Sequence, residues 1–311
     1  MMDRYGRDTV VAAARIQSPR NGPNVQPTPS SSGSDSSSGL TGAPDPPVYG
    51  LDFWLCYVGN TSLMIAVSVL FRYSDFVITY LGGSEFQLGL VVGVGMVGAL
   101  AMRLFQGRGI DHYGPRRIWL GSLLAFIVAM LLHLGVHSAF GPGIFLARIL
   151  MMISLAGAFG ASLAYISLRV PEGRIAEMVG MLGTSGFVGL AVGPVLGDLI
   201  FQQESVTGPV VNRMFLCAAG MGLLSLICVG VATRKTVRRR KHRRSPPLLW
   251  LIKRYHPGPL LVVAAAMGLA VTLPHTFLRP YTARLGIDEI RNFFLVYSAT
   301  AFVVRVSTRR L

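Results

Sequence analysis

Long apolar runs recur along the chain and constrain its fold more than any other feature. Eight of these runs approach twenty residues, the length that a helix needs to cross a hydrocarbon core of about 30 Å. Only α-helices and closed β-barrels satisfy all their backbone hydrogen bonds inside lipid. The strands of a barrel alternate apolar and polar residues, and these runs do not. The sequence therefore predicts an all-α polytopic membrane protein.

The spacing of the runs predicts four regions. A Ser-, Pro- and Gly-rich tail at 1–50 carries too few apolar residues to order itself. Six runs then follow closely, and we expect them to form a six-helix bundle at 51–233. A basic linker at 234–258 leads to the first two helices of a second, incomplete bundle at 259–311. The eight expected spans cover residues 53–79, 87–106, 118–136, 144–167, 178–200, 212–233, 259–281 and 290–308.

Positive charge gathers in alternate connections between the runs. Segments 107–117, 166–177 and 234–258 hold 3, 2 and 10 Lys or Arg, 15 in all, whereas the four other connections together hold 1. Basic residues concentrate in the cytoplasmic loops of membrane proteins. We therefore expect a multi-pass protein of the cell inner membrane, with both termini in the cytoplasm.

The cysteines argue against a disulfide-rich protein or a metalloprotein, and the position of the basic residues argues against a nucleic-acid-binding protein. Cys56, Cys217 and Cys228 lie in apolar runs without the spacing of metal ligands, so we expect no disulfide framework, metal site or cofactor. The net charge is +15, but 8 of the 29 Lys and Arg directly follow an apolar run. That position is typical of a cytoplasmic flank that binds anionic lipid. Membrane lipids, and not nucleic acid, are the expected partners.

The connection at 107–117, GRGIDHYGPRR, combines glycines with three arginines and an aspartate. Gly114 allows the positive φ of a tight turn, and Pro115 suits the first position of the next helix. Asp111 suits a helix N-terminus, and the arginines suit carboxylates or lipid phosphates. We expect this loop to lock two helix bundles together on the cytoplasmic face and to release them when the other face closes.

This segment resembles the loop signature of the major facilitator superfamily, which is Gly, three residues, then Asp-Arg-x-Gly-Arg-Arg between helices two and three. His112 and Pro115 stand where the signature has arginines. The resemblance implies secondary active transport of a small-molecule substrate by alternating access, without enzymatic chemistry. It also implies a gating loop, and the gating residues would be Gly107, Asp111, Gly114, Arg116 and Arg117.

The run at 178–200 contains GLAVGPVLGD, which is similar to the Gly-x-x-x-Gly-Pro-x-x-Gly-Gly of drug–proton antiporters. Small residues let a neighbouring helix approach closely, and a proline bends a helix. Asp198 replaces the last glycine of the pattern. The resemblance implies an efflux-type member with a packing motif in its fifth helix, made by Gly189, Gly193, Pro194 and Gly197.

The family usually has twelve helices, and this sequence predicts eight. The resemblance therefore implies either a truncated carrier or a fragment that needs another polypeptide, and a missing C-terminal half would be one of its partners.

Ionisable side chains inside a membrane are costly and often functional. Arg72 and Asp75 are three residues apart on one helix face, so we expect them to pair or to line an outer vestibule. Arg148 stands where facilitators often carry an arginine linked to proton coupling. These three are the candidate coupling or substrate residues, with Asp75 or Arg148 coupled to protons. Arg279 is expected to be an anchor at a helix end.

Two other functions fit parts of the sequence. Ser185 lies in GTSGF, which resembles the Gly-x-Ser-Gly of rhomboid proteases, and His275 would be its base; such a short match is not specific without the matching geometry. The protease also accounts for neither the segment at 107–117 nor the distribution of charge. The second alternative is a non-transporting membrane scaffold or sensor that binds a partner or anionic lipid through the basic linker. We expect a carrier instead, with proton-coupled efflux as its specific form.

Overall fold

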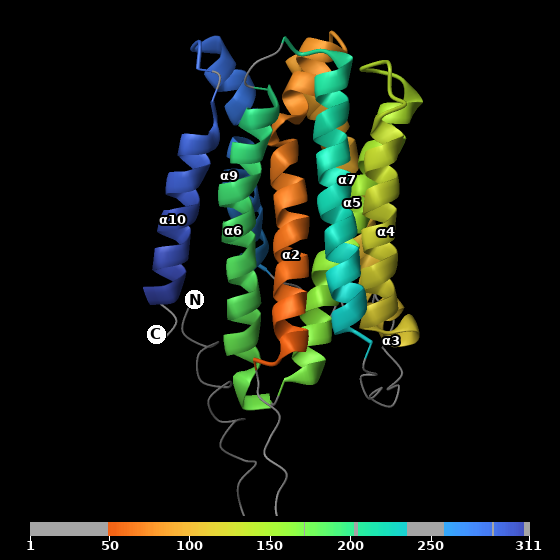
Figure 1. Ribbon diagram of the computed structural model, residues 1–311, viewed down its shortest axis with the longest axis vertical. Helices are drawn as coiled ribbons and strands as arrows, with labels where there is room; N and C mark the ends of the chain where they lie inside the picture. The colour runs from red at the N-terminus through yellow and green to blue at the C-terminus, as the bar shows by residue number, and fades with distance from the viewer. Residues whose placement is uncertain (1–48, 171, 202–204, 235–257, 288, 308–311) are drawn as a thin grey trace, which may run out of the picture. The chain divides into compact units, whose positions relative to one another are not determined.

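The structure is a computed structural model that describes residues 49–170, 172–201, 205–234, 258–287 and 289–307. The tail predicted at 1–50 and the linker predicted at 234–258 lie almost entirely outside these residues. The described residues form helices and no β-strand (Figure 1). Seven of their helices are long and apolar enough to cross a membrane. The prediction of an all-α polytopic membrane protein is confirmed.

The long helices agree closely with the predicted spans. The first span is made of three pieces, because α2 continues into a 3-10 turn, η1, and then into a π-helix, η2. The helices are α2 (Leu51–Val69), η1 (Leu70–Arg72), η2 (Asp75–Tyr80), α3 (Glu85–Tyr113), α4 (Pro115–His133), α5 (Pro142–Arg169), a 3-10 turn (Glu172–Arg174), α6 (Ile175–Phe201), α7 (Gly208–Ala232), α9 (Leu260–Arg284) and α10 (Arg291–Ser307).

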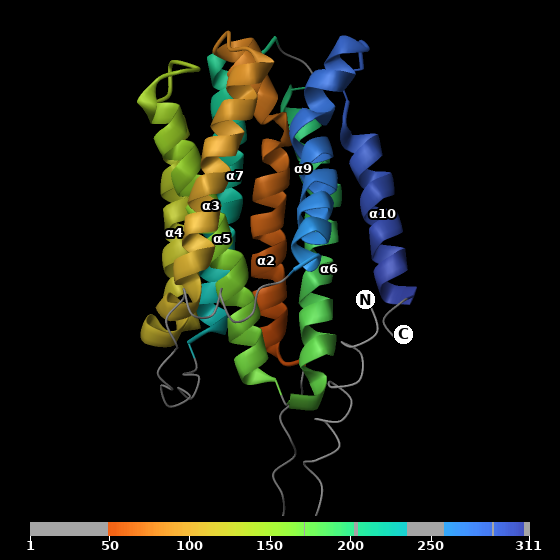
Figure 2. The ribbon, with the colours of Figure 1, turned by 180° about the vertical axis from the view of Figure 1, so that it is seen from behind.

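The first six long helices pack into a bundle around α2 and α5. Helix α2 contacts α6 and α7, and helix α5 contacts α3 and α4, as Figure 1 and the reverse view in Figure 2 show. Aromatic side chains fill the interior, with Trp119, Phe126 and Phe215 fully buried. Helix α10 runs alongside α6.

Helix ends follow local signals in the sequence. The Ser84 hydroxyl accepts a hydrogen bond from the Gln87 backbone N–H at 3.3 Å, and the Gln87 side chain accepts from the Ser84 N–H at 2.8 Å. This capping box satisfies N–H groups that the first turn of α3 leaves without partners. Proline occupies the first turn of α4, α5 and α7, where its missing N–H costs nothing.

The segment at 107–117 is not the loop that the sequence predicted. Helix α3 runs through it to Tyr113, and α4 begins at Pro115, so only Gly114 separates two helices. Gly114 has a φ of +86°, which residues with a Cβ rarely adopt. The expected turn is therefore one residue long, and the charged residues around it are helical.

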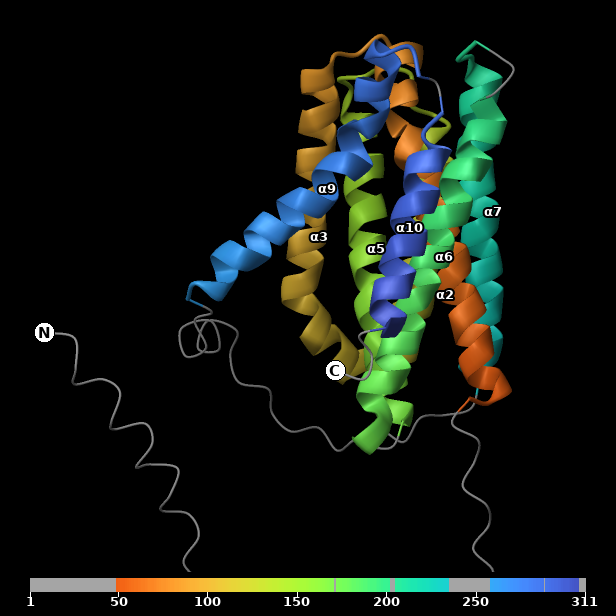
Figure 3. The ribbon, with the colours of Figure 1, turned by 90° about the vertical axis from the view of Figure 1, so that its left-hand side faces the viewer.

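The two C-terminal helices differ from the six before them. The described part of α10 is 17 residues long, shorter than the roughly 20 that a membrane span needs, so the described residues contain seven candidate spans instead of the predicted eight. Helix α9 is exposed throughout residues 260–270, and in Figure 3 this part diverges from α3. Only its C-terminal part packs against the bundle.

Candidate functional site

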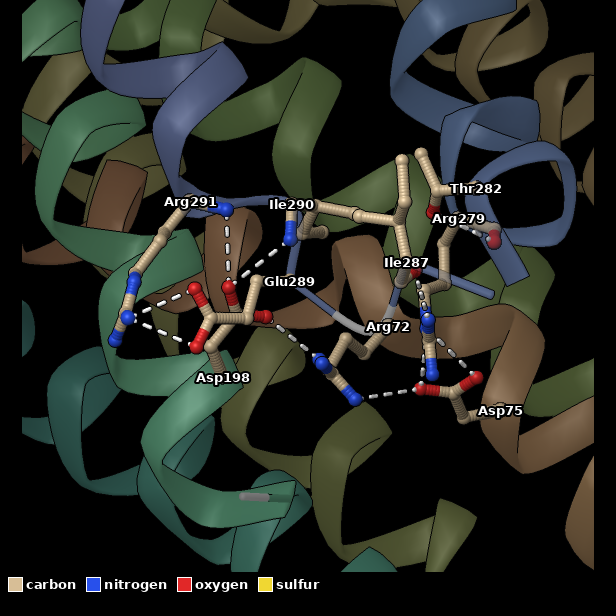
Figure 4. Close-up of polar contacts among 9 residues, drawn as sticks. All are labelled: Arg72, Asp75, Asp198, Arg279, Thr282, Ile287, Glu289, Ile290 and Arg291. Carbon is tan, nitrogen blue, oxygen red and sulfur yellow. Dashed lines mark hydrogen bonds and ion pairs between the residues drawn. The ribbon is translucent and has the colours of Figure 1, made fainter. Parts of the chain in front are cut away.

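Arg72 bridges two buried carboxylates at one end of the bundle (Figure 4). Its Nη1 donates to Asp75 Oδ2 at 3.0 Å, and its Nε donates to Asp198 Oδ1 at 2.9 Å. The three residues are only 4%, 5% and 1% exposed, in chain order. The sequence predicted that Arg72 and Asp75 either pair or line an outer vestibule. In the structure they form a buried pair.

Asp198 also holds the beginning of α10. Its second oxygen, Oδ2, accepts hydrogen bonds from the backbone N–H groups of Ile290 at 3.0 Å and Arg291 at 2.9 Å. A carboxylate at this position satisfies free N–H groups of the first turn and faces the positive end of the helix dipole. Asp198 of α6 thus caps a helix that lies about ninety residues further along the chain.

Arg279 of α9 completes the cluster. Its Nε donates to both oxygens of Asp75 at 3.2 Å, and its Nη1 donates to the Ile287 carbonyl at 3.2 Å. The sequence predicted an anchor at a helix end, but Arg279 is buried and bonds to a carboxylate. The prediction was wrong because the carboxylate that neutralises Arg279 comes from 204 residues earlier in the chain.

Arg72, Asp75, Asp198 and Arg279 are called the charged cluster below. Two carboxylates serve two guanidinium groups and two backbone amides in it. Removing one partner from a buried pair leaves an uncompensated charge, which costs about 3–5 kcal/mol. The cluster therefore ties α2 and α6 to α9 and α10 as long as all its members keep their charge.

Glycines on α6 let this helix approach α2 closely, which brings Arg72 and Asp198 together. A Cβ at Gly193 would lie 2.9 Å from the carbonyl carbon of Ser68, and a Cβ at Gly189 would lie 2.8 Å from that of Met64. The backbones of α2 and α6 approach this closely only because both side chains are absent. One turn further on, Gly197 faces Val69 and Arg72, so the glycine stripe leads directly to the Arg72–Asp198 pair.

The π-helix η2 positions Asp75, another member of the charged cluster. Asp75 is the first residue of η2 (Asp75–Tyr80), and π-turns often accompany functional sites because they change the direction of side chains. At this point Asp75 meets Arg72 from its own helix and Arg279 from α9.

Arg148 is not part of the charged cluster, although the sequence grouped it with Arg72 and Asp75. It lies in the second turn of α5, 7% exposed, with its guanidinium 4.4 Å from the centre of the Tyr73 ring. Arg148 therefore lies at a site separate from Arg72 and Asp75.

The segment predicted to gate the cytoplasmic face lies at the far end of α3 from the charged cluster. Arg116 Nε donates to the Thr233 hydroxyl at the end of α7, at 3.3 Å. Gly107, Asp111 and Arg117 are exposed. The gating role of this segment stays a prediction.

The geometry separates the residues of the protease alternative. The Ser185 hydroxyl donates to the Leu182 carbonyl and accepts from the Asn60 amide, each at 2.6 Å. His275 packs edge-on against Phe71 at 4.9 Å between ring centres and bonds the Val271 carbonyl. Each side chain has partners of its own, and the described contacts do not join them.

Comparison with known protein families shows which family the chain belongs to. Residues 53–311, which are more than half of the chain, match the sequence profile of the Major Facilitator Superfamily. The chain belongs to the Major Facilitator Superfamily. No individual curated protein matches it. As a member of this superfamily, it is an integral multi-pass membrane protein that transports a small solute across a membrane.

The membership confirms the resemblance to the superfamily that rested on the segment at 107–117. The efflux type and the truncation stay predictions. Sequence reasoning missed the function of Asp198, which looked like a departure from the glycine pattern. A signal was present, because an aspartate within an apolar run of a membrane helix usually has a partner or a function.

Proposed function

We propose that this facilitator is a proton-coupled exporter and that the charged cluster is its outer gate. The observation that supports this best is that Asp198 accepts hydrogen bonds on both of its carboxylate oxygens. One carboxylate oxygen holds Arg72 beside α2, and the other holds the amides of Ile290 and Arg291 at the start of α10. Alternating access requires the two halves to separate at one end at a time, and separation at this end must break these bonds.

The distribution of charge supports an external position for the gate. The charged cluster lies at the helix ends whose connections hold a single Lys or Arg, whereas the segments at 107–117 and 166–177 lie at the opposite ends. Because basic loops remain in the cytoplasm, both termini would be cytoplasmic and the cluster would face the cell exterior.

A proton is a suitable trigger for such a gate. A carboxyl that takes up a proton loses its negative charge, so its attraction for a guanidinium falls. Of the two residues predicted to couple protons, we retain Asp75, because Arg148 keeps its own proton at any physiological pH. A proton that reaches Asp75 from outside would weaken its bonds to Arg72 and Arg279, open the outer end and release the solute.

Everted membrane vesicles that contain the full chain test this proposal. Their lumen is made acidic, and the accumulation of fluorescent organic cations, neutral compounds and organic anions is measured. We expect accumulation of at least one compound, with loss of the accumulation on addition of a protonophore and in Asp75→Asn. Arg103→Gln, which removes an exposed arginine of α3, serves as the control and should transport normally.

Three outcomes of this assay would contradict the proposal. Accumulation in right-side-out vesicles alone would indicate uptake. Accumulation that resists the protonophore and the Asp75→Asn change would exclude proton coupling through Asp75. A lack of accumulation in both orientations, for every compound, would argue against export.

A further inference from the structure

Arg148 is a buried cation that the charged cluster does not neutralise. Among the described residues, three arginines are buried, and the other two, Arg72 and Arg279, bond to carboxylates. Within the same part of the chain, Arg148 has no hydrogen-bond partner for its buried Nε. Its Nη1 contacts only the weak acceptor Sδ of Met151, at 3.6 Å.

The fold makes room for this side chain. Gly95 of α3 faces it, and a Cβ there would lie 2.8 Å from Arg148 Cγ. An arginine near a helix end can usually extend to the membrane surface, yet Arg148 turns inward, where Tyr73 covers one face of its guanidinium. Gly95 therefore leaves room for the stem of Arg148, and the Tyr73 ring lies against its guanidinium.

Tyr73 and His133 bond to each other, and none of the described hydrogen bonds joins either of them to Arg148. His133 Nδ1 bonds the Ala129 carbonyl at 2.6 Å, and it must carry the hydrogen because a carbonyl only accepts. In the singly protonated ring, Nε2 then accepts from the Tyr73 hydroxyl, 3.3 Å away. This pair provides no hydrogen bond to Arg148, whose Nε lacks a partner among the described residues.

The buried charges therefore do not balance. Among the residues that the structure describes, three buried guanidinium groups stand against two buried carboxylates, and both carboxylates bond to other members of the charged cluster. A buried charge without a partner is strongly unfavourable, and an arginine cannot relieve this by losing its proton. A negative group from outside the described chain would restore the balance.

We propose that Arg148 binds an oxyanion of the transported solute, either a carboxylate or a phosphate. A guanidinium matches both groups with two parallel N–H donors, and its Nε–H edge is the part of Arg148 that lacks a partner. This inference deepens the proposed export function and rests on it, because it assigns the solute to the class of organic anions.

Ligand-dependent stability of the purified full chain tests this site without a proton gradient. The protein is placed in nanodiscs of zwitterionic phosphatidylcholine, and its Tm is followed against benzoate or inorganic phosphate at constant ionic strength in chloride. A ligand that binds only the folded state raises Tm in a saturable way. We expect a rise of roughly 5 °C at saturation with at least one probe.

Substitutions at Arg148 distinguish binding from a structural role. Arg148→Met should abolish the response, and in chloride alone it should raise Tm, because it removes an unbalanced buried charge. Arg148→Lys keeps the charge without the paired donors and should require higher probe concentrations. Arg103→Met, the same change at an exposed arginine, should respond as the wild type does.

Several results would overturn the inference. These are the lack of a saturable shift with both probes, an equal shift in Arg148→Met, and a lower Tm of Arg148→Met in chloride alone. A shift produced by phosphatidylglycerol nanodiscs but by neither probe would assign the site to a lipid headgroup and overturn it too. Because binding is measured without transport, vesicles that fail to export would contradict the proposed function and leave this binding result standing.

Discussion

At the scale of single residues, Asp198 connects parts of the chain that are remote in sequence. It accepts hydrogen bonds from Arg72 on one oxygen and from the Ile290 and Arg291 amides at the start of α10 on the other, and it is 1% exposed. Buried pairs of this kind contribute through the cost of breaking them rather than through a large net gain. Its importance therefore shows in how strongly Asp198 and Arg72 depend on each other.

A double-mutant cycle measures this dependence. Arg72→Gln, Asp198→Asn and the double variant are compared by the free energy of unfolding of the purified protein. We expect a coupling energy of roughly 0.5–3 kcal/mol, as for residues within one hydrogen-bonded network.

The chain offers a matched control for the cycle. Arg174 and Glu177 form an ion pair at 3.0 Å whose side chains are 45% and 48% exposed. The same cycle on this pair should give less than about 1 kcal/mol, because water screens it. Equal coupling in the two cycles would show that burial adds nothing to the Arg72–Asp198 pair.

Sequence reasoning could place some of these residues but not join them. Arg72 and Asp75 share a helix face at a spacing of three, so their pairing was foreseeable from local geometry. Asp198 and Arg279 reach the cluster from α6 and α9, and nothing local to either residue indicates its partner. The burial of Arg148 depends on Gly95 and Tyr73 of other helices, which a single helix pattern does not reveal.

At the scale of elements, the packing of α2 on α6 positions the charged cluster. The close approach at Gly189 and Gly193 was foreseeable because small residues at a spacing of four typically mark helix contacts in membranes. The helical course of 107–117 was not foreseeable. Glycine is a poor helix former by about 1 kcal/mol, so Gly107 and Gly109 indicated a loop, yet Ile110 packs against the core and the helix continues to Tyr113.

A single methyl group tests the approach of α2 and α6. Gly193→Ala places a Cβ 2.9 Å from the backbone of Ser68, and the overpacking should lower the free energy of unfolding by about 1–3 kcal/mol. Thermal or denaturant unfolding of the purified variant measures the loss.

Gly180→Ala on the same helix is the control. A Cβ at Gly180 would meet nothing within 4 Å, so the gain in helix propensity should leave the protein unchanged or raise its stability by up to about 1 kcal/mol. If both variants behaved alike, the close contact at Gly193 would not limit how α2 and α6 pack.

At the scale of the whole molecule, the two ends of the helices are held by different contacts. At the end near the Gly114 turn, Arg169 and Asp52 pair at 3.0 Å within the six-helix bundle. At the other end, the charged cluster and an exposed Arg284–Glu85 pair at 2.5 Å link the bundle to α9 and α10. This asymmetry agrees with a gate at the end of the charged cluster.

The distribution of basic residues predicts the orientation of the molecule. In a background without Cys56, Cys217 and Cys228, a cysteine in place of the exposed Ile287 should react with a membrane-impermeant maleimide on intact cells. A cysteine in place of Ser245, within the basic linker, should react only after the membrane is permeabilised. The reverse pattern would place the charged cluster in the cytoplasm and contradict an outer gate.

The distance between α6 and α10 tests the central claim that Asp198 holds these helices together. Spin labels at Leu199 and Phe293, both exposed, report this distance by pulsed electron paramagnetic resonance of the full chain in nanodiscs. The account predicts one narrow, short distribution in the otherwise unaltered chain and a broader, longer one in Asp198→Asn, because the cap on α10 and the bond to Arg72 are both weakened. An identical distribution in the two proteins would contradict it.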